Sequence, residues 1–394
     1  MKLPVYLDYN ATTPCDPAVA ERMLPYFTDY FGNASSRDHS YGWIARDAVD
    51  EARRQVAKLV GARPAEIVFT SGATEAVNLA LKGIAEAYRG AGNHIITQKT
   101  EHKAVLDSCA YLEENGCSVT YLDAEADGSL SLEALEQAIT TGTCCIALMY
   151  ANNETGVIHP VREIGALAKR HGVCFFSDAT QAAGKIPVDV AGDHIDLMAF
   201  SSHKIYGPKG VGALYAASSR TAPGIRAQMH GGAQEKGLRS GTLNVPGIVG
   251  FGHAAALCSQ TMDAEHERLQ QLRDKIEAEL TGAIPGARVN GGGRRLPHVT
   301  NLVLPGAASE ELLLSLSGYL AASRGSACAS NVQKPSHVLK AMGLSDYDAR
   351  HSVRLSLGRF VTEEEVDFAI GKIKSAVRAL QDSPVEIPLA DSVI

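Results

Sequence analysis

The stretch CCIALMYANNETGVIHPVREIGALAKRHGVCFFSD, residues 144–178, decides the fold. Two runs within it, CCIALMY at 144–150 and VCFFS at 173–177, are apolar at almost every position. A helix-prone segment at 160–171 lies between them. Strands of a parallel sheet carry helices on both faces, so they are apolar on both sides. The stretch therefore predicts two parallel strands joined by a crossover helix.

The same alternation of strand and helix continues on both sides of this stretch. Further strands are expected at 66–70, 94–98, 117–122, 196–200 and 211–215, and helices at about 73–88, from about 102, and near 131–139. Alternation of this kind predicts an α/β fold with a mainly parallel sheet in a large domain.

The pattern changes after a long helix-prone segment at about 246–280. Expected strands near 299–303 and 352–357 then mix with expected helices near 308–316, 335–342 and 362–380. We therefore predict a large domain at 15–260 and a smaller α+β domain formed by 1–14 and 261–394. The length of 394 residues also favours two domains, because single cores stop growing near roughly 250–300 residues.

Composition excludes several classes of protein. The net charge of −7 argues against a binder of nucleic acid or anionic membranes, which would be basic. Pro4 and Asp8 interrupt the N-terminal segment where a signal peptide needs an apolar run. No stretch approaches the roughly 18 consecutive apolar residues of a membrane span. We expect a cytoplasmic protein.

The eight cysteines contain no CxxC pair, and a reducing compartment makes disulfides a poor explanation for them. Cys144, Cys145 and Cys174 lie in apolar strand-like runs and are expected to be inert core residues. Cys328 differs, because it lies in SRGSACASN at 323–331 among small residues that pack loosely. This setting suits a reactive thiol on a mobile loop.

Lys204 lies in FSSHKIYGPKG, residues 200–210, just after an expected buried strand. Most lysines are solvated surface groups, but here Ser201, Ser202 and His203 precede the lysine. Hydroxyls and an imidazole at the carboxyl end of a strand suit a phosphate. A lysine beside a phosphate site, with a pKa that burial can lower, suits covalent attachment of pyridoxal phosphate.

Pyridoxal phosphate needs an acid at its ring nitrogen. Asp178 directly follows an apolar strand and can supply that carboxylate, although an Asp there is also a common helix cap. Gln181 can donate to the ring's phenolate oxygen.

The phosphate site is expected at the start of a helix. Gly72 permits a sharp turn before this helix, which starts near Ala73 and Thr74. Capping alone is the alternative role for Thr74.

Four further residues are weaker candidates on sequence alone. His102 follows a strand and starts a helix, so it could stack on the cofactor and move protons, or merely cap the helix. Arg354 lies in an apolar strand and could grip a carboxylate, or form a structural ion pair. Asn153 lies just past a buried strand, and Thr242 lies in the turn-like GLRSGTLN.

Nine short motifs together resemble one family, the cysteine desulfurases of the NifS- and IscS-like branch (group I) of the class-V aminotransferases. They are YLDYNATTP, TSGATEAVN, EHKAVL, NNETGVI, DATQAAGK, SSHKIYGPKG, RSGT, GSACAS and RLSLGRF, and the resemblance spans about residues 5–375. It implies a fold-type-I, pyridoxal-phosphate-dependent transferase that works as a homodimer and converts L-cysteine to L-alanine.

The resemblance also implies a role for each candidate residue. Lys204 carries the cofactor, Asp178 and Gln181 hold its ring, and the phosphate is bound by Ala73, Thr74, Ser201, Ser202 and His203, with Thr242 reaching it from the neighbouring subunit. His102 stacks on the ring and manages protons, while Asn153 and Arg354 take the substrate carboxylate. Cys328 is the nucleophile that accepts the sulfur as a persulfide. No resident metal is expected, although Cys328 could transiently ligate a cluster with a scaffold partner.

Some alternatives stay open. Selenocysteine cleavage would use nearly the same site, whereas a transaminase needs no Cys328 loop, and a non-catalytic sulfur-transfer partner would usually lack Lys204 or Cys328. The C-terminal SPVEIPLADSVI, residues 383–394, does not resemble the tail that docks a scaffold protein in housekeeping members of the family. The sulfur acceptor, for iron–sulfur cluster assembly or tRNA thiolation, is therefore open.

Overall fold

The computed structural model describes residues 1–218, 224–324 and 335–382. Cys328 and the C-terminal segment 383–394 lie outside the described residues, as do the expectations attached to them.

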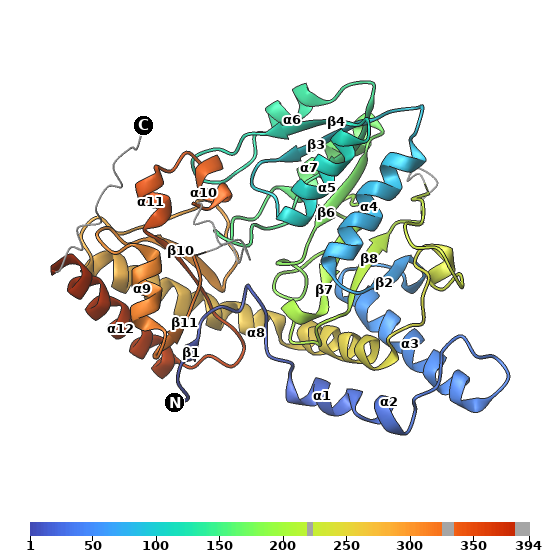
Figure 1. The fold of residues 1–394 in the computed structure, drawn as a ribbon, viewed down its shortest axis with the longest axis horizontal. Helices are drawn as coiled ribbons and strands as arrows, with labels where there is room; N and C mark the ends of the chain where they lie inside the picture. Colours follow the sequence, from blue (N-terminus) through green and yellow to red (C-terminus); the bar gives the residue numbers. More distant parts are fainter. Residues whose placement is uncertain (219–223, 325–334, 383–394) are drawn as a thin grey trace, which may run out of the picture.

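Within the described ranges, a seven-stranded sheet forms the centre of the large domain (Figure 1). The strands are β2 (Ile67–Thr70), β3 (His94–Gln98), β4 (Ser118–Leu122), β5 (Thr143–Ala147), β6 (Cys174–Asp178), β7 (Leu197–Ser201) and β8 (Gly212–Ala216), in the order β2-β8-β7-β6-β5-β3-β4. All neighbours from β4 to β7 pair in parallel, whereas β8 pairs antiparallel with both β7 and β2. The predicted, mainly parallel sheet is confirmed.

Helices cover both faces of this sheet. Alternate strand residues such as Phe176 and Ala199 pack against α4 (Ala73–Ala87) and α5 (Lys103–Glu114) on one face. On the other face, residues such as Phe175 and Phe200 pack in a core with α3 (Ser40–Leu59), α7 (Val161–His171) and α8 (Val245–Ala283). The shorter helices of this domain are α1 (Pro17–Met23), α2 (Pro25–Thr28) and α6 (Leu132–Ala138). Cys144, Cys145 and Cys174 are buried between these layers, as expected of core residues.

The small domain contains a three-stranded antiparallel sheet in the order β12-β10-β9. Its strands are β9 (Arg288–Val289), β10 (Val299–Val303) and β12 (Ser352–Ser356), and its helices are α9 (Ser309–Leu316), α10 (His337–Ala341), α11 (Asp346–Arg350) and α12 (Glu363–Asp382). The N-terminal β1 (Val5–Tyr6) pairs in parallel with β11 (Leu320–Ala321), while the assignment of residues 1–14 to this domain stays a prediction. The predicted division after residue 260 falls within α8 and stays a prediction.

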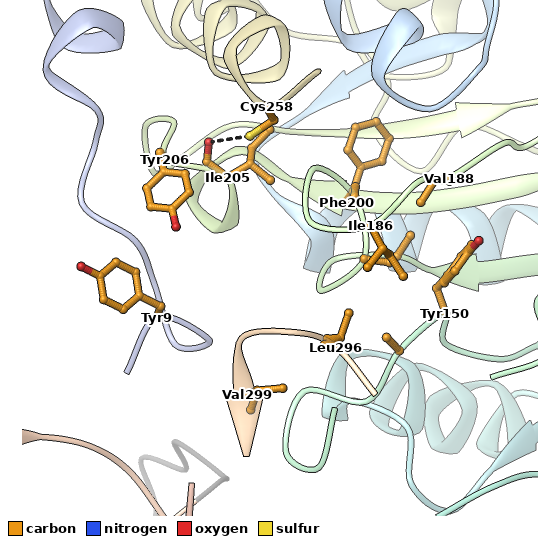
Figure 2. Packing of buried hydrophobic residues seen from close by; sticks show 14 of the residues in the cluster. Tyr9, Tyr150, Ile186, Val188, Phe200, Ile205, Tyr206, Cys258, Leu296 and Val299 are labelled. Atoms are coloured by element: carbon orange, nitrogen blue, oxygen red, sulfur yellow. Dashed lines mark hydrogen bonds between the residues drawn. The ribbon is translucent and has the colours of Figure 1, made fainter. Parts of the chain in front are cut away.

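One hydrophobic core connects the two domains. In Figure 1, α8 runs from beneath the large sheet to the small domain. Figure 2 shows part of the shared core, in which Tyr9 of the N-terminal segment, Tyr206 after β7 and Leu296 of the small domain belong to one cluster. Cys258 of α8 donates from Sγ to the carbonyl oxygen of Ile205 there, at 3.7 Å. This core holds the segment after β7 against the N-terminal segment, and both reach the site described below.

None of the helices in the described ranges combines the length and apolarity that a membrane crossing requires.

Candidate active site

A cavity of about 700 Å³ opens where the large sheet, the small domain and the N-terminal segment meet. Ten of the predicted site residues line it: Ala73, Thr74, His102, Asn153, Asp178, Gln181, Ser201, His203, Lys204 and Arg354. Residues from β6, β7 and the start of α4 converge here because the carboxyl ends of parallel strands meet at one edge of a sheet.

Lys204 ends a short 3₁₀ turn, Ser202–Lys204, that directly follows β7. Its Nζ donates to the carbonyl oxygens of Asn10 and Ala11, the second at 2.8 Å. Burial, reinforced by the positive charge of Arg354, lowers the pKa of the Lys204 amine to about 8. An amine with this pKa is partly neutral near physiological pH, which is the form that can act as a nucleophile or a base.

Asp178 is the last residue of β6 and is only 6% exposed. Its Oδ1 accepts a hydrogen bond from the backbone N–H of Thr180 at 2.9 Å, so the carboxylate does stabilise its own turn, as the capping alternative supposed. It also lines the same cavity as Lys204. An acid at the end of β6 and an amine just after the neighbouring strand β7 thus face one cavity.

The start of α4 forms the anion-binding part of the cavity. The helix begins at Ala73 after Gly72, and no side chain caps its first turn, so the capping-only role considered for Thr74 does not hold. The first backbone N–H groups of a helix have no partner within the helix, and they favour an anion. Ser201 and His203 line the cavity beside this helix start. The group suits a phosphate.

His203 is well placed to be a neutral hydrogen-bonding group. Burial, followed by the positive charge of Lys204, lowers the pKa of His203 to about 4. Its Nδ1 lies 3.1 Å from Thr12 Oγ1.

His102 has both roles that the sequence allowed. It is the N-cap of α5, where its Nδ1 accepts from the backbone N–H of Ala104 at 3.1 Å, and it also lines the cavity. His102 is exposed because it faces the open cavity. The surrounding protein still desolvates the imidazole and so lowers its pKa, whereas the negative charge of Asp178 opposes this shift. With Nδ1 accepting, the proton of the neutral ring is on Nε2.

Arg354 also combines two roles. It lies in the middle of β12, is 2% exposed and lines the cavity. It forms an ion pair with Asp8 at 2.7 Å and donates to the carbonyl oxygen of Asn153 at 3.0 Å. Arg354 therefore forms the structural ion pair that the sequence allowed, and the pair with Asp8 holds the planar guanidinium at the wall of the cavity.

Two predicted residues lie elsewhere in the part of the chain that the structure describes. Ser202 is fully buried, and its side chain points towards Gly207, away from the cavity. We therefore remove Ser202 from the phosphate group. Thr242 is exposed and does not line the cavity of its own chain. Cys328 lies outside the described residues.

Sequence reasoning missed several residues that line the site, and three of them are polar or titratable residues from segments distant in the sequence. Asn10, Thr12 and His337 line the cavity, the first two from the N-terminal segment and the third from α10. Asn10 is 1% exposed and forms hydrogen bonds with five different segments of the described chain. The polar run after the apolar VYL in the N-terminal segment was the signal that could have suggested it.

The sequence is similar to known proteins over nearly its whole length. Residues 5–368 match the model of the family described as aminotransferase class-V. The cysteine desulfurase IscS of Anaeromyxobacter sp. (strain Fw109-5) is 50% identical over 385 residues, which cover 97% of this chain and 94% of that protein. The cysteine desulfurase IscS of Methylococcus capsulatus is 51% identical over 385 residues, with the same coverage of 97% and 94%.

Solved structures show the same fold. A NifS-like protein superposes with a TM-score of 0.89 at 37% identity, covering 96% of this chain and 100% of the other. SspA in complex with cysteine gives a TM-score of 0.80 at 38% identity, covering 90% of this chain and 98% of the other.

Proposed function

The chain belongs to the cysteine desulfurases of the class-V aminotransferase family, and from this premise we propose that it binds pyridoxal phosphate at Lys204 and moves the sulfur of L-cysteine to Cys328. The family depends on pyridoxal phosphate. One observation carries the proposal: the amine of Lys204, with its lowered pKa, faces the same cavity as Asp178 and the uncapped start of α4.

The residues present fit this cofactor. The uncapped helix start with Ser201 and His203 would hold the phosphate, and Asp178 would pair with the ring nitrogen. Gln181 lines the cavity and would reach the ring oxygen, while His102 would lie against the ring face. When bound, pyridoxal phosphate withdraws electrons from the α-carbon of an amino acid joined to it, which makes loss of the Cα proton feasible.

The protein's own groups then orient the substrate and move its protons. Arg354, fixed by Asp8 and by the Asn153 carbonyl, is placed to hold the substrate carboxylate with its two-pronged donor group. The neutral amine of Lys204 takes the Cα proton. His102 carries its ring proton on Nε2, the atom that can exchange protons in the cavity.

Sulfur transfer completes the reaction. The thiolate of Cys328 forms a bond to the substrate sulfur while the Cβ–S bond breaks, and the electron pair of that bond stays with the carbon side. Protonation of that carbon side gives alanine, and the transferred sulfur remains on Cys328 as a persulfide. A reductant or an acceptor protein then removes this sulfur.

The test is direct. Purified protein with pyridoxal phosphate, L-cysteine and dithiothreitol should release alanine and sulfide in equal amounts. Alanine without sulfide, or neither product, would contradict the proposed function.

The partners are part of the proposal. A homodimer is supported by Thr242, which is exposed and does not line the cavity of its own chain, and by exposed apolar side chains on α1 to α3 and their connection. These include Leu24 at 63%, Phe27 at 59%, Phe31 at 65% and Trp43 at 50% exposed.

The acceptor is a sulfur-accepting protein, such as an iron–sulfur scaffold or a tRNA-thiolation protein. The seven cysteines in the described ranges are all free, which suits a reducing compartment such as the cytoplasm.

Replacement of Asp178 tests the ring-nitrogen assignment. Asp178→Asn keeps the side-chain size but removes the charge, so we expect weaker cofactor retention and a loss of turnover of roughly 10²- to 10³-fold, similar to the loss of other preorganised electrostatic contacts. Cofactor content by absorbance and alanine release are the measurements. Asp123→Asn is the control, because Asp123 is 83% exposed and pairs only with a surface lysine in the described structure. Full occupancy and native turnover in Asp178→Asn would remove Asp178 from the site.

The lowered pKa of Lys204 predicts how the cofactor-free protein captures pyridoxal phosphate. Only the neutral amine attacks the aldehyde, so the capture rate should rise with pH through a midpoint near the pKa of about 8 and level off above it. Arg354 lowers this pKa, so Arg354→Met should move the midpoint to higher pH. Stopped-flow absorbance measures the rates. A midpoint near 10.4, the value of an unperturbed lysine, would show that the amine is not desolvated.

A further inference from the structure

Lys185 is a buried lysine that the reaction described above does not use. It lies on the segment after β6, four residues beyond Gln181, to whose Oε1 its Nζ donates at 3.2 Å. The same Nζ lies 3.0 Å from Nε2 of His298. A cavity of about 20 Å³ beside these groups holds no more than about one water molecule, so Lys185 does not belong to a second ligand site.

Two independent contacts fix the orientation of the Gln181 amide. Its oxygen accepts from Lys185, and its Nε2 donates to the carbonyl oxygen of Asn10 at 3.0 Å. A carbonyl oxygen only accepts, so both contacts require the same amide orientation. The second hydrogen on Nε2 is left for an acceptor in the cavity that Gln181 lines. Gln181 is therefore set as a donor towards the site.

His298 and Asn10 in turn fix Lys185. Asn10 donates from Nδ2 to the Asn153 carbonyl oxygen at 3.0 Å, so its Oδ1 is the atom that lies 2.8 Å from His298 Nε2. Because Oδ1 only accepts, Nε2 must carry the proton. The single Nε2 proton is therefore shared between Asn10 Oδ1 and the Lys185 amine, whose lone pair can accept it only while the amine is neutral and its own hydrogens point to Gln181.

The electrostatics agree with this arrangement. Burial, followed by repulsion from Lys204, lowers the pKa of Lys185 to about 7, and burial lowers the pKa of His298 well below its usual value. Some of the Lys185 side chain remains accessible, but its amine end is enclosed by hydrogen-bonding groups of the protein. A lysine amine next to a neutral imidazole in such surroundings is easily kept neutral.

We infer that Lys185 is a positioning residue, which locks the Gln181 amide so that an N–H, and never the oxygen, faces the ring oxygen of the bound cofactor. This inference rests on the proposed function. Without Lys185, Gln181 Oε1 would be a buried acceptor without its donor, and only the contact with the Asn10 carbonyl oxygen would still hold the amide, so the amide would rotate more readily. Rotation would then set one oxygen against another at the cofactor.

Lys185→Met tests the inference, because methionine keeps the volume and removes the donor. We expect cofactor binding to weaken by roughly five- to tenfold, about the effect of one lost hydrogen bond, and the visible absorption band of the bound cofactor to shift. Lys185→Arg, which restores a donor, should recover most of both properties. The thermal midpoint of the cofactor-free variant should change little, since the lost hydrogen bond is offset when an apolar group replaces a buried amine. A merely structural role would instead lower the midpoint and leave the absorption band in place.

A double-mutant cycle with Gln181→Ala shows whether Lys185 acts through Gln181. In the Gln181→Ala background, Lys185→Met should cause no further loss of cofactor affinity. Lys169→Met, at an exposed position of α7, is the matched control and should bind like the wild type. Wild-type affinity and spectrum in Lys185→Met, or a full additional loss in the double variant, would overturn the inference alone. A wild-type chain that binds no pyridoxal phosphate would overturn the proposed function as well.

Discussion

Lys204→Ala should reduce the release of alanine from L-cysteine by at least about 10³-fold, because it removes the residue proposed as both the covalent anchor of the cofactor and the base for the Cα proton. The loss should not come from unfolding. Lys204 donates only to two carbonyl oxygens of the N-terminal segment, Asn10 and Ala11, in the described structure. The phosphate and ring contacts through α4 and Asp178 stay in place, so the variant should still hold pyridoxal phosphate without a covalent bond.

Two controls make this prediction specific. Lys204→Arg keeps the positive charge but should be as inactive as Lys204→Ala, because a guanidinium stays protonated and cannot act as a nucleophile or a base. Lys209→Met removes another lysine that lines the cavity and should leave covalent attachment of the cofactor intact. Borohydride reduction followed by peptide mapping should place the cofactor on Lys204 in the wild type. Native turnover in Lys204→Ala would refute the assignment.

Cys328→Ser should abolish sulfide release while leaving the cofactor site intact. Its pyridoxal phosphate should bind with the wild-type spectrum, and addition of L-cysteine should still change that spectrum, since the proposed substrate binding uses Lys204, Asp178 and Arg354. A serine hydroxyl is a far weaker nucleophile than a thiolate, so no sulfur should leave the substrate. Sulfide release at more than a trace level from this variant would show that another group takes the sulfur.

The other cysteines supply the controls. Burial raises the pKa of Cys109 and of Cys144 to about 12, and that of Cys258 to about 11, so these thiols are protonated and inert near neutral pH. Cys15 is partly exposed and free, and burial raises its pKa too. Cys15→Ser should therefore retain wild-type sulfide release, which makes it the matched control for Cys328→Ser.

Sequence patterns predicted the features that depend on continuous runs of one residue type. The apolar runs CCIALMY and VCFFS became β5 and β6, because a strand covered on both faces must be apolar on both sides. Asp178 and Lys204 could be placed at one edge of the sheet because each follows an apolar run that predicts a strand. The direction of a strand could not be predicted from its apolar run, since β8 is as apolar as its neighbours and yet runs antiparallel to β7.

Contacts between distant segments could not be predicted. Asn10 reaches Lys204 across 194 positions and His298 across 288, and no local pattern encodes either pairing. The sequence also could not predict the direction of a single side chain in a tight turn. Ser201, Ser202 and His203 look alike as phosphate ligands in the sequence, but the turn after β7 points Ser202 towards Gly207 and away from the cavity. Such details depend on backbone geometry that sequence periodicity does not specify.

The most direct test of sulfur transfer to Cys328 is to map where the sulfur goes. The protein, loaded with pyridoxal phosphate, is exposed briefly to L-cysteine without reductant, alkylated and digested, and its peptides are analysed by mass spectrometry. We predict one added sulfur on the peptide that contains Cys328 in the wild type, and none on any peptide of Lys204→Ala. An added sulfur on a peptide with a different cysteine, and none on that of Cys328, would contradict the account.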